Sequence, residues 1–260
     1  MYVFGGIDQH QERFNDIHEF CYETNAWTRV VSIGTAPSPR TFHQSLFLNG
    51  YMYILGGFDG WKRSDMFRIL IEQRNGAKSN NPAGALNELE EEKGIESYPE
   101  QRPFSREFFQ ELPLLTWYRA KSTGSVYTPR TGHEVIIYKE KIYLFGGTDD
   151  DDRKNDIYMY DVHTNTWERL PSSGSSPTPR SGAKGVAYKD SLYFFGGYTK
   201  KLGEYYNDFH RYDLRMKKWI KLELQGTPPS ERNDHSVVIY EGCMYLFGGY
   251  DGKTRFQDFF

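Results

Sequence analysis

The sequence predicts an all-β protein built from repeated four-stranded units, and three regular spacings lead to this prediction. An arginine precedes the first glycine of a Gly-Gly pair by 16 residues at four places, namely Arg40, Arg130, Arg180 and Arg232. An aspartate follows each of the five Gly-Gly pairs after 8 to 11 residues. Trp27, Trp167 and Trp219 each come 11 residues after one of these aspartates. The resulting period of about 50 residues is typical of a repeat architecture.

The unit that begins at Arg130 shows how each strand is predicted. Residues 133–138 are β-branched and apolar, residues 142–145 form a short apolar run, residues 156–162 alternate in hydrophobicity, and residues 167–170 close the unit. Turn-forming residues separate these runs, including the Gly-Gly pair itself. Each unit is therefore predicted to form four short antiparallel strands.

The glycines and the tryptophan each have a predicted structural role. A strand that leaves the crowded centre of a ring of sheets needs positive φ and no Cβ at the turn, which a Gly-Gly pair supplies. The tryptophan falls on the outermost strand of its unit. We expect it to cover the gap to the next sheet. Burial of its side chain there should stabilise the fold by roughly a few kcal/mol.

We predict a single domain, residues 1–260, that contains five units. The units are a partial one at 1–31, complete ones at 39–122, 129–171 and 179–225, and a partial one at 231–260. Met1 to Gly6 matches Met244 to Gly249, so the chain is expected to begin on the second strand of a unit. We expect residues beyond both ends to complete the ring.

An insertion at residues 72–115 enlarges the second unit. Its beginning has a linker-like composition, and residues 86–93 could form two helical turns before Gly94. One interpretation is a solvated loop. The alternative is a docking segment, because Phe104, Phe108 and Phe109 are costly to leave exposed.

The combined motifs resemble the kelch repeat of β-propellers over nearly the whole chain. The Pro-Arg-x-x-His openings at Pro39-Arg40 and Pro129-Arg130 are most similar to those of host cell factor and the leucine-zipper-like regulator. One unit departs from this pattern, because Ser181, Gly182 and Ala183 follow Arg180. The resemblance implies a ring of six or seven four-stranded blades, of which this chain supplies about five.

Composition excludes several classes of function. A net charge of −3 means that the chain has no excess of positive charge with which to attract nucleic acid or an anionic membrane. No apolar run approaches the length of a membrane-spanning helix, and no signal peptide opens the chain. The two cysteines, Cys21 and Cys243, are far apart in predicted strands, which favours buried thiols in a reducing compartment. We expect a cytoplasmic or nuclear protein.

Strand alternation predicts which loops share a surface. The start of the first strand and the end of the second emerge together, so the Arg-opening loops should lie beside the loops that follow the Gly-Gly pairs. Loops on a rigid scaffold commonly carry binding sites. The predicted contacts with a protein partner are Arg40, Phe42, Phe58, Asp59, Trp61, Arg130, Asp149, Arg180, Tyr198, Arg232, Asn233 and Tyr250. The insertion should leave from the opposite side.

Each feature of this surface also has a purely structural interpretation. The aromatic side chains could contact a partner, or they could pack on one another. The arginines could bind ligand carboxylates or, more simply, bond the backbone of a neighbouring blade. The run Asp149 to Asp152 is most simply a solvated loop, although it could meet a basic partner or a cation.

We expect a non-catalytic protein-interaction module without metal or cofactor. His43, His133 and His235 occupy equivalent positions on separate units, too far apart for the short bonds of a zinc site. No nucleophile, acid–base pair or iron-ligand motif stands out by spacing. The alternative is a small-molecule enzyme, or a metal-dependent activity, at the mouth of the central channel.

Overall fold

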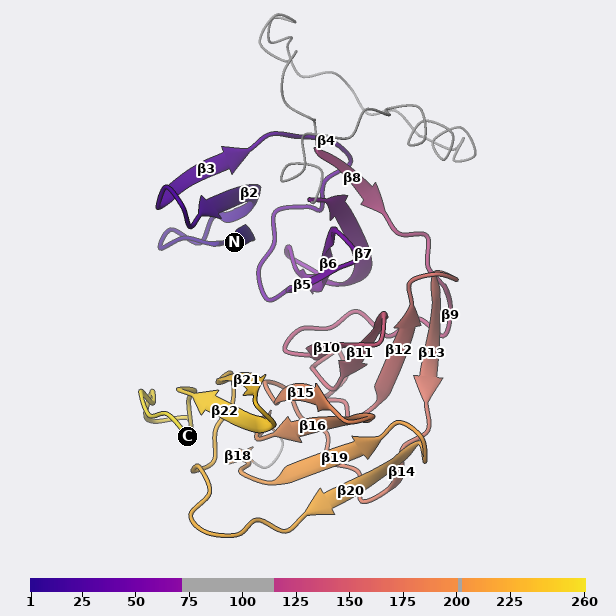
Figure 1. Cartoon of the computed structure of the whole chain (residues 1–260), viewed down its shortest axis with the longest axis vertical. Coiled ribbons are helices and arrows are strands. Elements are labelled where there is room, and N and C mark those ends of the chain that lie inside the picture. The colour runs from indigo at the N-terminus through magenta and orange to yellow at the C-terminus, as the bar shows by residue number, and fades with distance from the viewer. Residues whose placement is uncertain (72–114, 201–202) are drawn as a thin grey trace, which may run out of the picture.

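The computed structural model describes residues 1–71, 115–200 and 203–260, and every regular element in these ranges is a β-strand. The strands form five sheets, called blades 1 to 5 in chain order, and one short hairpin. Figure 1 shows the blades following one another in an arc around a common centre, with blades 1 and 5 at its two ends. The predicted all-β fold of repeated antiparallel sheets is confirmed.

Blades 2 to 4 each extend from a short outer strand to an inner strand, whereas blade 1 has three strands. Blade 1 contains β1 (Tyr2–Ile7), β2 (Arg13–Cys21) and β3 (Ala26–Val30). From the outer edge inwards, blade 2 has the order β4 (Ser32–Gly34), β8 (Leu115–Arg119), β7 (Lys62–Leu70), β6 (Tyr51–Phe58), β5 (Gln44–Leu48). Blade 3 has the order β9 (Thr123–Gly124), β13 (Thr166–Leu170), β12 (Ile157–Asp161), β11 (Lys141–Phe145), β10 (Glu134–Tyr138).

Blade 4 has the order β14 (Ser173–Gly174), β20 (Lys218–Leu222), β19 (Phe209–Asp213), β16 (Ser191–Phe195), β15 (Lys184–Tyr188). Blade 5 contains β21 (Ser236–Tyr240) and β22 (Cys243–Phe247), and the hairpin β17 (Tyr198–Thr199) and β18 (Glu204–Tyr205) lies in a loop of blade 4. The four main strands of blades 2 to 4 are antiparallel neighbours, and the bounds in blade 3 agree with the predicted runs to within one or two residues.

The connection between blades contributes a fifth strand that the sequence analysis missed. β4, β9 and β14 each precede the four main strands of their blade and pair in parallel with its outermost strand. Each ends in a glycine with positive φ, and a Cβ on Gly124 would lie 2.3 Å from the carbonyl oxygen of Trp167. The close backbone approach therefore requires glycine at this position.

The core lies between neighbouring blades, because alternate residues of each strand face opposite sides of the sheet. Ile142 and Leu144 of β11 pack in a cluster with residues of blade 2, whereas Tyr143 and Phe145 pack in a cluster with residues of blade 4. Both faces of the strand are therefore buried. This explains why its sequence is a continuous apolar run.

The tryptophans face the preceding blade, not the next one as predicted. Trp167 is 1% exposed in a cluster with Leu55 and Met66 of blade 2, and Trp219 of blade 4 lies 5.2 Å from the ring of Phe145 in blade 3. The tryptophan side chain points this way because of the pleat of the sheet. Trp167 and Trp219 lie opposite Tyr160 and Tyr212 on the neighbouring strands, and paired residues face the same side of a sheet. Trp27 in blade 1 has no preceding blade in this chain and is 53% exposed.

The first strand of blade 1 pairs as the second strand of a unit does. β1 pairs with β2 in the antiparallel manner in which a second strand pairs with a third.

The cysteines are not placed as predicted. Cys21 and Cys243 are both free, as expected for a chain without a disulfide framework. The expectation of buried thiols is wrong, because Cys21 is half-buried and Cys243 is exposed on β22 of the last blade.

Residues 72–114 of the predicted insertion lie outside the described residues. The expected helical turns at 86–93 and the role of Phe104, Phe108 and Phe109 therefore stay predictions. Leu115, at the end of the predicted insertion, is instead the first residue of β8 and is buried. The Ile71 amide donates to the carbonyl of Gly50 in the β5–β6 turn. The chain therefore leaves blade 2 on the side away from its Gly-Gly pair.

Within the described ranges, no helix has the length and apolar character needed to cross a membrane.

Candidate functional site

The two predicted loop sets meet at one end of every blade that has both. Antiparallel bridges join Thr41 to Phe58, Thr131 to Thr148, Ser181 to Tyr198, and Asn233 to Tyr250. In each case a residue of an Arg-opening loop pairs with the residue after a Gly-Gly pair. These loops form one surface, which we call the Gly-pair face. It consists of residues 38–43, 58–64, 128–133, 148–155, 178–183, 198–200, 203–207, 230–235 and 250–257.

The Gly-Gly pairs hold neighbouring blades together. The amide of Gly147 donates to the carbonyl of Arg180 in the next blade over 2.9 Å, and the amides of Gly6 and Gly197 do the same with Arg40 and Arg232. Gly146 and Gly147 have φ values of 65° and 93°, and a Cβ on Gly147 would lie 2.9 Å from the backbone of His133. The predicted need for positive φ without a Cβ is confirmed.

The four repeated arginines lie inside the blades and require a correction. Their side chains are 0 to 2% exposed, so a partner cannot reach them. Arg130 donates to the carbonyl of Gly146 over 2.9 Å and to both carboxylate oxygens of Asp156 over 2.5 and 3.2 Å. Arg40, Arg180 and Arg232 make the same contacts with Asp65, Asp208 and Asp258.

The arginines also connect neighbouring blades, but through their backbone and not through their side chains as the structural interpretation of the sequence had it. Their guanidinium groups bond their own blade, while their backbone amides donate to the preceding blade, as Arg180 does to the carbonyl of Lys154 over 3.0 Å. The side chain therefore stiffens the loop from which the backbone reaches out. Burial opposes ionisation of Asp208, but hydrogen bonds from His210 and Arg180 hold its pKa well below the usual range.

Asp59 and Asp149 shape their loops, which also corrects the predicted contacts. The side chain of each is 6% exposed. Asp59 accepts hydrogen bonds from Ser38 and from the Nε of Arg63. Asp149 accepts from Thr128, Lys154 and the backbone amides of residues 151 and 152. These bonds hold the pKa of Asp149 well below its usual range despite burial.

Several aromatic side chains of this face pack on one another. The rings of Tyr198 and Tyr205 are 4.5 Å apart, and Tyr205 makes an edge contact with Tyr250 at 6.2 Å. The guanidinium of Arg153 lies over Tyr198, and that of Arg13 lies over Phe58. All these rings are half-buried. The packing interpretation therefore accounts for Phe58, Tyr198 and Tyr250.

Two aromatic side chains of the face remain open to solvent. Phe42 is 67% exposed and Trp61 is 75% exposed. Trp61 is held at a loop tip, because its amide donates to the Asp59 carboxylate and its carbonyl accepts from the Asp59 amide, each over 3.2 Å. Asn233 is half-buried in the chain's last Arg-opening loop and donates to Asp234 over 2.8 Å.

The repeated histidines are neutral, with His133 and His235 buried and His43 half-buried. His133 and His235 are each 1% exposed, and neither ring nitrogen has a partner among the described residues. Burial, with Arg130 nearby, lowers the pKa of His133 to about 3. Burial also lowers the pKa of His235 to about 3 and that of His43 to about 4. Within the described ranges, no three His, Cys, Asp or Glu side chains are grouped as metal ligands would be.

These histidines should make stability fall in acid. An unfolded histidine has a pKa of about 6.5. Below that pH the unfolded chain binds protons that the folded chain does not, so the free energy of unfolding falls as the pH falls from about 6.5 towards 3. His133→Gln should reduce this slope by up to about 1.4 kcal/mol per pH unit. Denaturant titrations at several pH values measure the slope.

His10→Gln provides the control, because His10 is exposed in a loop of blade 1. Its slope should match that of the wild-type protein. If His133→Gln also left the slope unchanged, His133 would not be buried in the neutral form.

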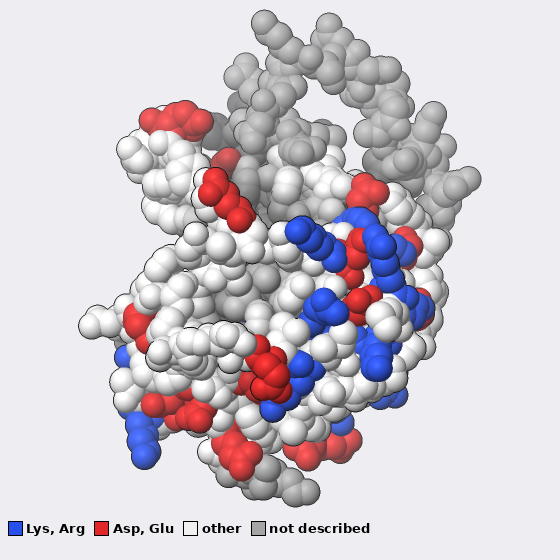
Figure 2. Space-filling model, turned by 60° about the horizontal axis from the view of Figure 1, so that its bottom comes forward, with Lys and Arg blue, Asp and Glu red and all other residues white. Residues whose placement is uncertain are grey.

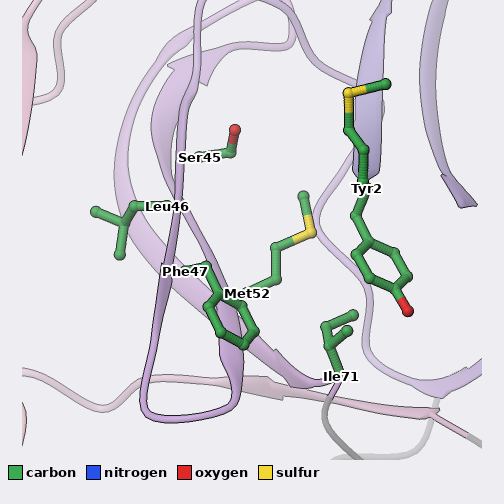
Figure 3. Close-up of a pocket in the computed structure, with 7 residues that line it drawn as sticks. Tyr2, Ser45, Leu46, Phe47, Met52 and Ile71 are labelled. Atoms are coloured by element: carbon green, nitrogen blue, oxygen red, sulfur yellow. The ribbon is translucent and has the colours of Figure 1, made fainter. Parts of the chain in front are cut away.

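A cavity between blades 1 and 2 offers little for acid–base chemistry. It has a volume of about 380 Å³ and is lined by Met1, Tyr2, Ser45, Leu46, Phe47, Met52 and Ile71 (Figure 3). The only titratable side chain in this lining is the phenol of Tyr2, which donates to Glu19 over 2.7 Å. The lining is that of an apolar groove between sheets.

Charged side chains on the surface are mixed in sign. Figure 2 shows Lys and Arg side chains beside Asp and Glu ones on the face that it presents, with no extended field of one sign. On the Gly-pair face, Lys62 lies 3.3 Å from Asp150 and Lys154 lies 2.8 Å from Asp149. Much of the basic charge of this face is therefore already paired within it.

One exposed residue at the centre of the face was missed. Asp234 occupies the position that Phe42 holds in blade 2 and that Gly132 and Gly182 hold in blades 3 and 4. Alignment of the four Arg-opening loops would have identified it as the charged member of this set.

Comparison with known proteins identifies the family. The model of the KLHDC2/KLHL20/DRC7 Kelch-repeats domain matches residues 1–80 and 97–260. Tip elongation aberrant protein 1 of Schizosaccharomyces pombe is 34% identical over 97% of this chain and 24% of that protein. Human kelch domain-containing protein 3 is 31% identical over 96% of this chain and 44% of that protein.

Human leucine-zipper-like transcriptional regulator 1 is 37% identical over 50% of this chain and 16% of that protein. The chain thus spans less than half the length of each of these relatives. The residues that the family model matches include all five Gly-Gly pairs and the four buried arginines that hold the blades in register. The chain belongs to the kelch-repeat family.

Proposed function

We propose that this chain is a non-catalytic module that binds a protein partner through the Gly-pair face. Kelch-repeat domains generally mediate protein–protein interaction. The observation that carries the proposal is the exposure of Phe42 and Trp61, two large aromatic side chains on one blade. Exposed aromatic anchors on a rigid scaffold are what protein interfaces favour.

The blade itself gives no reason for the indole of Trp61. The equivalent loop of blade 5 is built in the same way around Asp251, whose carboxylate accepts hydrogen bonds from the amides of Lys253 and Thr254. That loop has no tryptophan. Because Asp59 fixes the backbone of Trp61, little backbone freedom would be lost when a partner covers the ring.

Replacing Trp61 by alanine should weaken partner binding by about 30-fold or more, which corresponds to an anchor of about 2 kcal/mol. The thermal stability should hardly change, because the indole is already exposed. Affinity purification from cells, followed by quantitative mass spectrometry, compares the proteins retained by wild-type and variant protein.

Tyr22→Ala is the matched control, because Tyr22 is 67% exposed in the β2–β3 turn at the opposite end of blade 1. It should retain the same proteins as wild type. Loss of these proteins with Tyr22→Ala but not with Trp61→Ala would place the binding surface on the other side of the molecule.

The whole protein could use this module to recruit substrates or to act as a scaffold. We also propose that it works in the cytoplasm or the nucleus. The two free cysteines support a reducing compartment, because an exposed thiol such as that of Cys243 is prone to oxidation elsewhere.

A further inference from the structure

The centre of the Gly-pair face is formed by one residue from each Arg-opening loop. These residues are Phe42, Gly132, Gly182 and Asp234, and we call them the central ring. The amide of Gly182 donates to the carbonyl of Gly132 over 2.8 Å, and the amide of Asp234 donates to the carbonyl of Gly182 over 2.9 Å. Blades 3, 4 and 5 are thus connected through these positions.

All four residues of the central ring have left-handed backbone conformations, with φ between 52° and 68°. Glycine adopts this conformation freely, whereas a bulky residue such as phenylalanine rarely does. Blades 3 and 4 use glycine at this position. Glycine would serve folding in blade 2 as well, so the side chain of Phe42 needs another explanation. Aspartate tolerates the left-handed region better than most residues do, so Asp234 adds no such strain.

Both side chains are open to solvent. Phe42 is 67% exposed, and Asp234 is also exposed. The other two residues of the central ring are glycines, so Phe42 and Asp234 supply the only side chains among these four positions. They present one aromatic surface and one carboxylate, from blades that are separated by blades 3 and 4 (Figure 1).

The charge of Asp234 is not balanced by an ion pair within the described residues. Its carboxylate accepts a hydrogen bond from the amide nitrogen of Asn233. The nearby Lys184 ammonium instead pairs with Glu134 over 2.9 Å, which leaves that pair neutral. Arg255 lines a cavity of about 500 Å³ together with Asp234, but its guanidinium lies 5.6 Å from the ring of Tyr250.

We propose that the central ring binds a lysine or arginine side chain of a partner protein. Asp234 would pair with the cation, and Phe42 would contact an apolar part of the same partner segment. A carboxylate with no cation of its own favours a basic ligand and disfavours an acidic one. This inference rests on the proposed function, because it specifies the chemistry of the partner.

A selection from random peptides displayed on phage tests the proposal. Peptides selected on the wild-type protein should carry Lys or Arg at one position and an apolar residue at another. Asp234→Asn should bind these peptides at least about tenfold more weakly, as expected when one partner of a charge pair is removed. Asp234→Lys should select Asp or Glu at the same position instead.

Two further variants control for folding and for general charge. Phe42→Gly should bind the selected peptides more weakly while its melting temperature stays the same or rises, because glycine suits the left-handed backbone. Asp151→Asn removes an exposed carboxylate of the same face and should bind them as wild type does.

The outcomes separate this inference from the proposed function. Peptides that depend on Trp61 but carry no basic position, or that bind Asp234→Asn as well as wild type, would overturn the central-ring proposal alone. Weaker binding by Asp151→Asn but not by Asp234→Asn would also overturn it and would assign the basic ligand to the acidic loop. Failure to select any peptide that depends on the Gly-pair face would count against both.

Discussion

Replacing Arg130 by methionine should lower the free energy of unfolding by about 3–5 kcal/mol, because Asp156 would stay buried without its partner. The side chain of Arg130 is 0% exposed and that of Asp156 is 10% exposed. The guanidinium also donates to the carbonyl of Gly146 and to two oxygen atoms of Thr128. The substitution removes all of these donors at once. Denaturant titration of the purified protein measures the loss.

Two further variants show whether the uncompensated charge is the cause. Arg169→Met changes an exposed arginine on β13 and should alter stability by less than about 0.5 kcal/mol. Arg130→Met combined with Asp156→Leu should be less destabilised than Arg130→Met alone, because no carboxylate remains to be buried. A double variant that is less stable than the single one would contradict this account.

Trp167→Ala should destabilise the protein by about 3–5 kcal/mol through the loss of a large buried side chain and the cavity that it leaves. Trp167 packs against Tyr127 and Tyr160, whose ring centroids are each 5.0 Å away, and against apolar residues of blade 2. The substitution breaks no hydrogen bond of the indole, because its nitrogen has no partner among the described residues. The effect is therefore one of packing.

Trp27→Ala is the matched control, because Trp27 has the same position in blade 1 and is 53% exposed. Its expected loss is below about 1.5 kcal/mol, since less apolar surface leaves contact. Equal losses at the two positions, measured by denaturant titration, would show that a preceding blade is not what buries Trp167.

The register of the repeat was predictable from single residues, namely the repeated Gly-Gly, Arg, Asp and Trp positions. Each of these residues has the same structural role in each blade that contains it. The positive φ of Gly146 and Gly147 and the alternation in 156–162 are properties of the chain near those residues. They therefore appear in the sequence wherever the structure repeats. Arg130 and Asp156 were also both visible as repeated markers, 25 to 28 residues apart in the four units, but spacing alone does not show that the two side chains pair or which way they point.

The exposure of the candidate site residues was predicted less well than the fold, because burial of a polar side chain depends on contacts that the sequence does not show. Arg40 and Asp59 are polar, and polar residues in loops are usually taken to be exposed. In this protein their side chains are buried, and each has several hydrogen-bond partners, some in its own loop and at least one on another strand or loop. Trp61 stands out in the sequence as an aromatic that its loop does not need, and its indole is exposed. Asp234 was missed because it stands out only when it is compared with the three equivalent residues of the other blades, none of which is charged.

The sequence by itself determined the all-β repeat, the strand order within a unit and the end of each blade at which the two loop sets meet. Tertiary structure alone decided that the connections between blades form parallel outer strands, that tryptophan faces the preceding blade, and that four arginines are internal. Local spacing encodes backbone conformation, whereas burial depends on which neighbouring sheet covers a side chain. A polar group such as the Arg130 guanidinium becomes internal only when distant parts of the chain provide its partners.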